Sequence, residues 1–155
     1  MIHESRYWKD DLLKTADKLE RKLTQTRWGD KNFFIVEKDI FLGFYAIRKL
    51  IESKKISDSL KQKKIEIIAY PYQGNIESVV KKFDENDYNL EKAKTIQLSV
   101  SKLCNQFIHS YHFIHSLTNG ENLDGFFFCS DNQRKSFLYF LPLIDIIAIY
   151  RNIGS

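Results

Sequence analysis

The sequence predicts an α+β fold in which two or three long helices pack with a small, mostly antiparallel sheet that includes a C-terminal β-hairpin. Near the N-terminus, apolar residues recur at three- and four-residue spacing over two long segments, which is typical of amphipathic helices. Later segments are short and rich in β-branched and aromatic residues, which is typical of strands. With 155 residues, 43% of them hydrophobic, the chain can build one core, and we expect a single domain over residues 1–155.

The first half of the chain predicts two helices. The first runs from about Tyr7 to Gln25, with leucines and Trp8 at helical spacing among charged residues. The second runs from about Asn32 to Ser53 and carries a broad apolar stripe. Such a stripe can face more than one neighbour, so we expect this helix to be central. A lysine-rich polar connection follows.

The middle of the chain mixes strand and helix patterns. Ile65–Tyr70 is rich in β-branched residues and predicts a strand. Residues 76–84 are compatible with a short helix. A third long helix is expected to begin at Leu90 or Ser99 and to end at Ser116, just before an Asn-Gly turn pair.

The last part of the chain predicts a hairpin and a final helix. Gly125–Ser130 and Lys135–Phe140 are two aromatic runs joined by a short polar loop, a pattern that indicates a β-hairpin. Residues 143–152 fit either a helix or a strand. The three- and four-residue spacing of their apolar side chains favours a helix. The expected sheet therefore contains the 65–70 strand and this hairpin.

Charge, cysteine content and the distribution of apolar residues restrict the partners and the cellular location of the protein. The formal net charge of +4 and the pI of about 8.9 permit nucleic acid or acidic partners without requiring them. Cys104 and Cys129 give no disulfide framework, and we expect two reduced thiols in the core. The N-terminal residues lack an apolar core of a signal peptide, and the most apolar stretch is interrupted by Pro142 and Asp145. We therefore expect a cytoplasmic protein that does not enter membranes.

Three of the four histidines lie within seven residues, as His109, His112 and His115. Histidine is the side chain whose charge changes nearest neutral pH, so this cluster is the main candidate for chemistry. On a continuous helix, Lys102, Asn105 and His112 would all fall within about 60° of His109. One face would then carry His109 as a general acid or base, Asn105 to orient a substrate oxygen or the imidazole, and His112 as a second proton donor or an anion contact.

This face suits metal-free RNA cleavage, which needs two proton-transfer groups and a cation to stabilise charge on the phosphate. Lys102 or Arg48 could supply that cation. Alternatively, these side chains have a purely structural role. They would then form a solvent-exposed polar face, or a hydrogen-bond network with a neighbouring helix in which every polar group has a partner. A zinc site would lack ligands beyond His109 and His112, so no metal and no cofactor are expected. Cys104 would point away from His109, which disfavours a nucleophilic cysteine–histidine pair.

The segment from Cys104 to His109 resembles the signature of HEPN (higher eukaryotes and prokaryotes nucleotide-binding) domains. These small helical proteins are often metal-independent ribonucleases of toxin–antitoxin and antiphage systems. Their motif places an arginine, a polar residue that is often asparagine, a short spacer and a histidine on one helix. Asn105 and His109 match it, whereas Cys104 occupies the arginine position, for which Arg48 is the first candidate replacement. The resemblance covers six residues directly and the helices of residues 7–116 loosely.

The resemblance implies an RNA-binding protein or metal-independent ribonuclease, with a homodimer among the expected states. The chain also looks like members of a bacterial protein group of no assigned activity, which share its pattern at Arg48–Glu52 and Cys104–Ser110. The alternative hypothesis is a non-catalytic interaction protein, of the immunity or accessory kind, that binds a protein partner through an aromatic surface or a hairpin edge. A small-ligand pocket between helices and sheet stays open as a third possibility.

Overall fold

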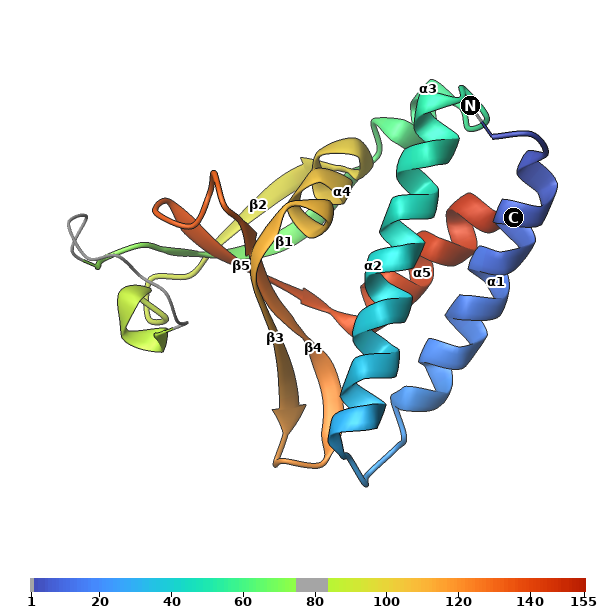
Figure 1. The fold of residues 1–155 in the computed structure, drawn as a ribbon. Coiled ribbons are helices and arrows are strands. Elements are labelled where there is room, and N and C mark those ends of the chain that lie inside the picture. Colours follow the sequence, from blue (N-terminus) through green and yellow to red (C-terminus); the bar gives the residue numbers. More distant parts are fainter. Residues whose placement is uncertain (1, 75–83) are drawn as a thin grey trace.

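The computed structural model describes residues 2–74 and 84–155, and it has the predicted α+β class (Figure 1). Its helices are α1 (Ser5–Lys22), α2 (Asp30–Glu52), α3 (Asp58–Lys61), α4 (Val100–Ile108) and α5 (Leu143–Gly154), with the 3-10 turn η1 (Glu85–Asp87). Its strands are β1 (Lys64–Pro71), β2 (Lys94–Ser99), β3 (Ser110–Thr118), β4 (Asn122–Ser130) and β5 (Phe137–Pro142). The short helix expected over 76–84 lies almost entirely outside the described residues.

The strands form a five-stranded sheet in the order β2-β1-β5-β4-β3, with antiparallel pairing between all neighbours. The predicted strand at 65–70 is confirmed as β1, and the predicted hairpin is confirmed as β4 and β5. The ambiguous segment after the hairpin is the helix α5. Strands β2 and β3 are additions that the sequence did not predict.

The third long helix is much shorter than predicted. It begins after Ser99, whose hydroxyl oxygen accepts a hydrogen bond from the backbone N–H of Lys102 at 3.2 Å. It ends at Ile108, and the chain then continues as the extended strand β3. The expectation of a helix up to Ser116 is therefore wrong beyond Ile108.

The turn that follows β3 explains this difference. Asn119 and Gly120 have φ values of 52° and 72°, so both adopt the left-handed conformation that a tight hairpin turn of type I′ requires. The backbone N–H of Glu121 donates to Thr118 O at 3.0 Å and closes the turn. The Asn-Gly pair thus joins two strands, and pairing with β4 stabilises β3 in the extended state.

The main core lies between the helices and one face of the sheet. Helix α2 is central, as predicted, and buries one side along its length, including Val36, Ile40, Phe44, Ile47 and Leu50. The ring of Phe107 on α4 stacks between Phe44 of α2 at 4.1 Å and Phe128 of β4 at 4.2 Å, measured between ring centroids. These contacts fix α4 between α2 and the sheet.

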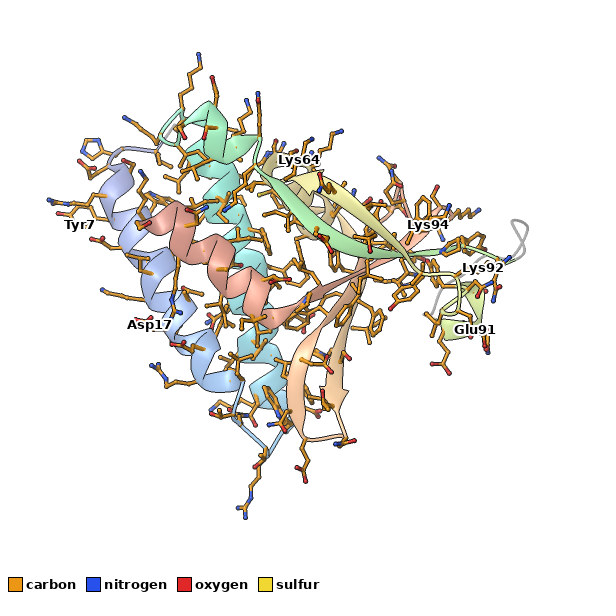
Figure 2. The ribbon with its side chains drawn as sticks, turned by 180° about the vertical axis from the view of Figure 1, so that it is seen from behind. Tyr7, Asp17, Lys64, Glu91, Lys92 and Lys94 are labelled. Carbon is orange, nitrogen blue, oxygen red and sulfur yellow. The ribbon has the colours of Figure 1, made fainter. Side chains whose placement is uncertain are left out.

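Helices α1 and α5 pack side by side and bring both chain termini to the same end of the molecule (Figure 1). Arg151 of α5 donates to Asp17 and Glu20 of α1 at 3.1 and 2.7 Å. A Cβ atom at Gly154 would lie only 2.9 Å from the backbone oxygen of Lys9, so the two helices approach closely where glycine is present. The opposite side of α1 faces solvent, as Tyr7 shows (Figure 2).

Candidate functional site

A polar cleft of about 320 Å³ lies where α2, the end of α4 and the β4–β5 loop meet. It is lined by seven residues, Arg48, Asn105, Gln106, His109, Ser130, Asn132 and Gln133, which we call the Arg48 cleft. The sequence predicted three of them as site residues: Arg48, Asn105 and His109. None of the seven is a carboxylate, and most carry hydrogen-bond donors.

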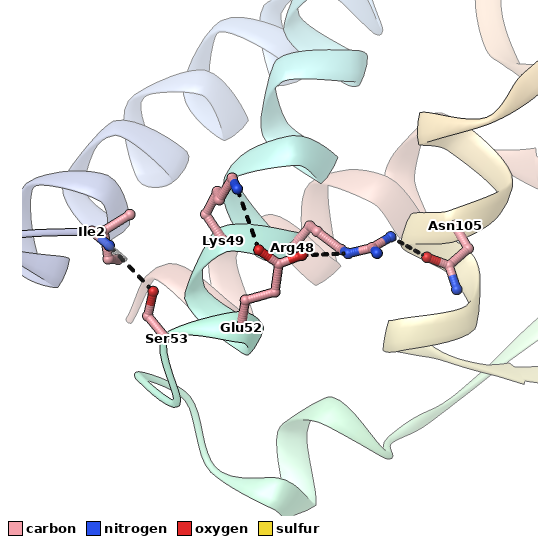
Figure 3. Close-up of polar contacts among 6 residues, drawn as sticks. All are labelled: Ile2, Arg48, Lys49, Glu52, Ser53 and Asn105. Carbon is pink, nitrogen blue, oxygen red and sulfur yellow. Dashed lines mark hydrogen bonds and ion pairs between the residues drawn. The ribbon is translucent and has the colours of Figure 1, made fainter.

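Arg48 connects the two helices across this cleft (Figure 3). One terminal nitrogen of its guanidinium donates to the side-chain oxygen of Asn105, and its Nε donates to Glu52 at 3.0 Å. Hydrogen bonds from Arg48 and then Lys49 lower the pKa of Glu52, so this carboxylate stays ionised beside the guanidinium. Within the described part of the chain, three of the five N–H donors of Arg48 are left to bind an oxyanion.

His109 sits at the C-terminal end of α4, one helical turn after Asn105. Its backbone N–H donates to Asn105 O at 3.0 Å, and its backbone oxygen accepts from the N–H of Asp131 at 3.2 Å. The side-chain oxygen of Gln106 accepts from the N–H of Ser130 at 3.1 Å, which ties the end of β4 to α4. The backbone around His109 is therefore held in place, while the imidazole and the Asn105 side chain are both exposed.

His112 does not share a face with His109, which corrects the helical-face prediction. It lies in β3 opposite Cys129, on the sheet face turned away from the helices, and only 6% of its surface is exposed. Burial, followed by the charge of Arg134, lowers its pKa. The error follows from the end of α4 at Ile108, because successive strand side chains point to opposite faces of the sheet.

Lys102 is exposed on the first turn of α4 and is not among the residues that line the Arg48 cleft. The cleft instead contains Gln106, Asn132 and Gln133, which the sequence did not single out. The polar loop between the two hairpin strands was predicted, but its approach to α4 depends on the packing of α4 against β4. Arg48 therefore provides the positive charge among the lining residues.

His115 is on the helix-facing side of β3, among aromatic rings. Its ring centroid is 4.5 Å from that of Phe33 and 5.7 Å from those of Phe113 and Phe126. Its Nε2 is buried and has no hydrogen-bond partner among the described residues. Burial lowers its pKa, against the smaller opposing effects of Glu37 and of a backbone hydrogen bond with Phe33.

Replacing His115 by phenylalanine is expected to make stability less dependent on pH. The folded-state pKa is lowered from 6.5, so the unfolded chain takes up the proton first, and the free energy of unfolding falls as pH drops below about 6.5. The His115→Phe variant lacks this proton uptake and the unpartnered nitrogen. Urea unfolding at pH 7 and pH 5 measures the difference, with the exposed His3→Phe as the matched control. An unchanged pH dependence in His115→Phe would refute the explanation.

Both cysteines are free and buried, as predicted. Burial raises the pKa of Cys104 to about 12 and that of Cys129 to about 11. Cys104 packs in the core rather than in the Arg48 cleft, so it forms no nucleophilic pair with His109.

Over residues 2–74 and 84–155, no three histidine, cysteine or carboxylate side chains are grouped so that they could hold one metal ion. Within the same ranges, no helix has the length and apolar content that a bilayer crossing needs. Comparisons with protein-family models, curated proteins and solved structures gave no match.

Proposed function

We propose that this protein binds single-stranded RNA in the Arg48 cleft and cleaves it without a metal ion, in the manner implied by the HEPN-like residues 104–109. The hydrogen bond between Arg48 and Asn105 is the observation that carries the proposal. It brings a guanidinium to the position next to the Asn-x-x-x-His pair, although Cys104 occupies the motif's own arginine position. A cleft with a fixed cation, amide donors and an accessible imidazole suits a phosphodiester.

The proposed chemistry assigns one role to each side chain. Arg48 and the amide nitrogen of Asn105 bind the non-bridging oxygens of the phosphate and stabilise the charge that develops on them. His109 accepts the proton of the ribose 2′-hydroxyl, whose oxygen attacks the adjacent phosphorus. The bond to the 5′-oxygen breaks, this oxygen takes a proton from water, and the strand ends in a 2′,3′-cyclic phosphate. His112 has no part in this scheme because it lies on the other face of the sheet.

Binding is tested through the four histidines, whose imidazole signals can be resolved by NMR in protein labelled at histidine. The probe is a single-stranded 2′-O-methyl oligoribonucleotide, which presents phosphates but cannot be cleaved. We expect the His109 signal to shift on titration, with His3, His112 and His115 largely unchanged. The shift should be lost in Arg48→Ala and retained in Arg27→Ala, because Arg27 is exposed and lies outside the cleft.

The alternative, a non-catalytic interaction protein, gives a different result in the same titration. It predicts that no histidine signal responds to the oligonucleotide at concentrations up to about 1 mM. That outcome, or a response that survives in Arg48→Ala, would rule out RNA binding at the Arg48 cleft. The exposed apolar side chains of α2 favour some protein contact, but they lie on a separate surface and are compatible with both functions.

A further inference from the structure

The two edges of the sheet differ in how well they are protected against further pairing. Strand β2 has six residues and carries Lys94, with Lys92 just before it (Figure 2). Charged edge residues of this kind discourage a further strand from pairing. Strand β3, at the other edge, has nine residues and contains no lysine, proline or carboxylate. In the described part of the chain β4 is the single strand that pairs with β3. On the other side of β3, the backbone groups of residues 113–118 have no strand partner among the described residues and can accept another strand.

The regular part of this edge is short and has a clear centre. The register of β3 against β4 is irregular between Ser110 and His112 and again between Ser116 and Leu117. Residues 112–116 lie between these irregularities, with Ile114 in the middle. An added strand would find a regular ladder here, and two identical strands would pair antiparallel about Ile114.

Helix α2 lies beside this edge, and two ring contacts set its level relative to β3. Its Phe33 ring contacts His115 at 4.5 Å, and its Phe41 ring contacts Phe113 at 4.7 Å, measured between centroids. The midpoint of these contacts puts residue 37 of α2 level with Ile114 of β3.

The outer side of α2 carries large apolar side chains that the chain leaves uncovered. Phe34 is 59% exposed and Leu42 is 57% exposed, although both belong to a helix that buries its other side. They line a shallow groove of about 360 Å³ together with Glu37, Lys38 and Phe41. Glu37 and Lys38, an adjacent acid and base, therefore lie in the middle of an apolar stripe, at the level of Ile114.

We propose that a second copy of this chain covers this surface, by pairing of the two β3 edges and packing of the two α2 helices about a two-fold axis. Antiparallel β3 pairing about Ile114 joins the two sheets into one continuous sheet. The same axis, passing near residues 37 and 38, places Phe34 opposite Phe41 of the second copy. It also places Glu37 of each copy opposite Lys38 of the other.

Self-complementarity favours a second copy over an unrelated protein. A two-fold operation requires each patch to match itself, and an adjacent acid and base on the axis satisfy this with two ion pairs. A second copy related by this single two-fold axis covers both the β3 edge and the apolar stripe of α2. The paired strands span about 30 Å. About an axis near residues 37 and 38, the two α2 helices overlap over residues 30–45, about 24 Å, which is compatible with the roughly 800 Å² per partner of a standard interface. Arg48 lies about ten residues from the axis, roughly 16 Å along the helix, so each copy keeps its own Arg48 cleft.

The mass of the protein in solution, from light scattering during gel filtration, tests the interface. A single chain has a mass of 18.4 kDa, and we expect twice that value at about 50 µM, a concentration well above the dissociation constant of a dimer with a Kd of about 1 µM. Leu42→Glu buries a charge in the apolar stripe and should weaken dimerisation at least 100-fold. Ile144→Glu, at a side chain 61% exposed on α5, is the matched control and should leave the dimer intact. Circular dichroism verifies that both variants are folded.

Two further sets of variants test the pairing itself. Lys38→Glu places like charges on the axis and should weaken the dimer, and Glu37→Lys combined with Lys38→Glu should restore it. Ile114→Cys should form a disulfide between copies under mild oxidation, whereas Thr95→Cys on the β2 edge should not. A monomeric wild-type protein, a dimer insensitive to Leu42→Glu, or cross-linking through Thr95→Cys alone would each overturn the proposal. None of these readouts involves RNA, so they are independent of the proposed function.

Discussion

Replacing Phe107 by alanine is expected to lower the free energy of unfolding by about 3–5 kcal/mol. The side chain is fully buried, and its ring stacks on Phe44 of α2 and on Phe128 of β4. Alanine would remove both stacking contacts and leave a cavity where α2, α4 and the sheet meet. Urea unfolding followed by circular dichroism measures the loss.

Tyr7→Ala is the matched control for this prediction, because Tyr7 is also aromatic and helical but is 63% exposed. It should change the free energy of unfolding by less than about 0.5 kcal/mol. A loss below about 1 kcal/mol in Phe107→Ala would show that α4 is not held by this stack. The result bears on the site as well, since α4 carries Asn105 and its C-terminal end carries His109.

The helices and strands with a clear local pattern were predicted correctly from the sequence. Helices α1 and α2 bury one side each, and that side is visible as apolar spacing along the chain. Strand β1 and the β4–β5 hairpin are rich in β-branched or aromatic residues between turn signals. In these segments the local preference and the final packing agree.

Strand β3 could not be predicted in this way, because residues 110–116 fit helical spacing and strand alternation about equally well. Pairing with β4 decides between the two, and that pairing is a tertiary contact. The local signal that could have found it is Asn119-Gly120, since such a pair between apolar segments is a strong hairpin indicator. Strand β2 is similar: Ile96 and Leu98 alternate with polar residues, but over six residues only.

The part of the candidate site whose residues are close together in the sequence was predictable. Asn105 lies on α4 and His109 caps its C-terminal end one turn later, so their proximity follows from helix geometry alone. Arg48 could be named as a candidate, but its contact with Asn105 spans 57 residues and depends on how α2 packs against α4. Asn132 and Gln133 reach the cleft from the hairpin loop through packing of the same kind, and no local pattern marks them.

The proposal that the Arg48 cleft cleaves RNA depends on His109, and the loss of this imidazole is expected to have a large effect. General base catalysis by a histidine contributes roughly 100- to 10,000-fold to a rate, so His109→Ala should reduce cleavage by at least about 100-fold. Stability should change little, because the side chain is exposed. His3→Ala, at another exposed histidine, should cleave at the wild-type rate.

The most direct measurement is the cleavage rate of a fluorophore-labelled single-stranded RNA in the presence of EDTA, compared among wild type, His109→Ala and His3→Ala. We expect wild type and His3→Ala to cleave the RNA and leave 2′,3′-cyclic phosphate ends, and we expect folded His109→Ala to cleave at least about 100-fold more slowly. Wild-type protein that leaves the RNA intact, or a His109→Ala variant that cleaves as fast as wild type, would contradict it.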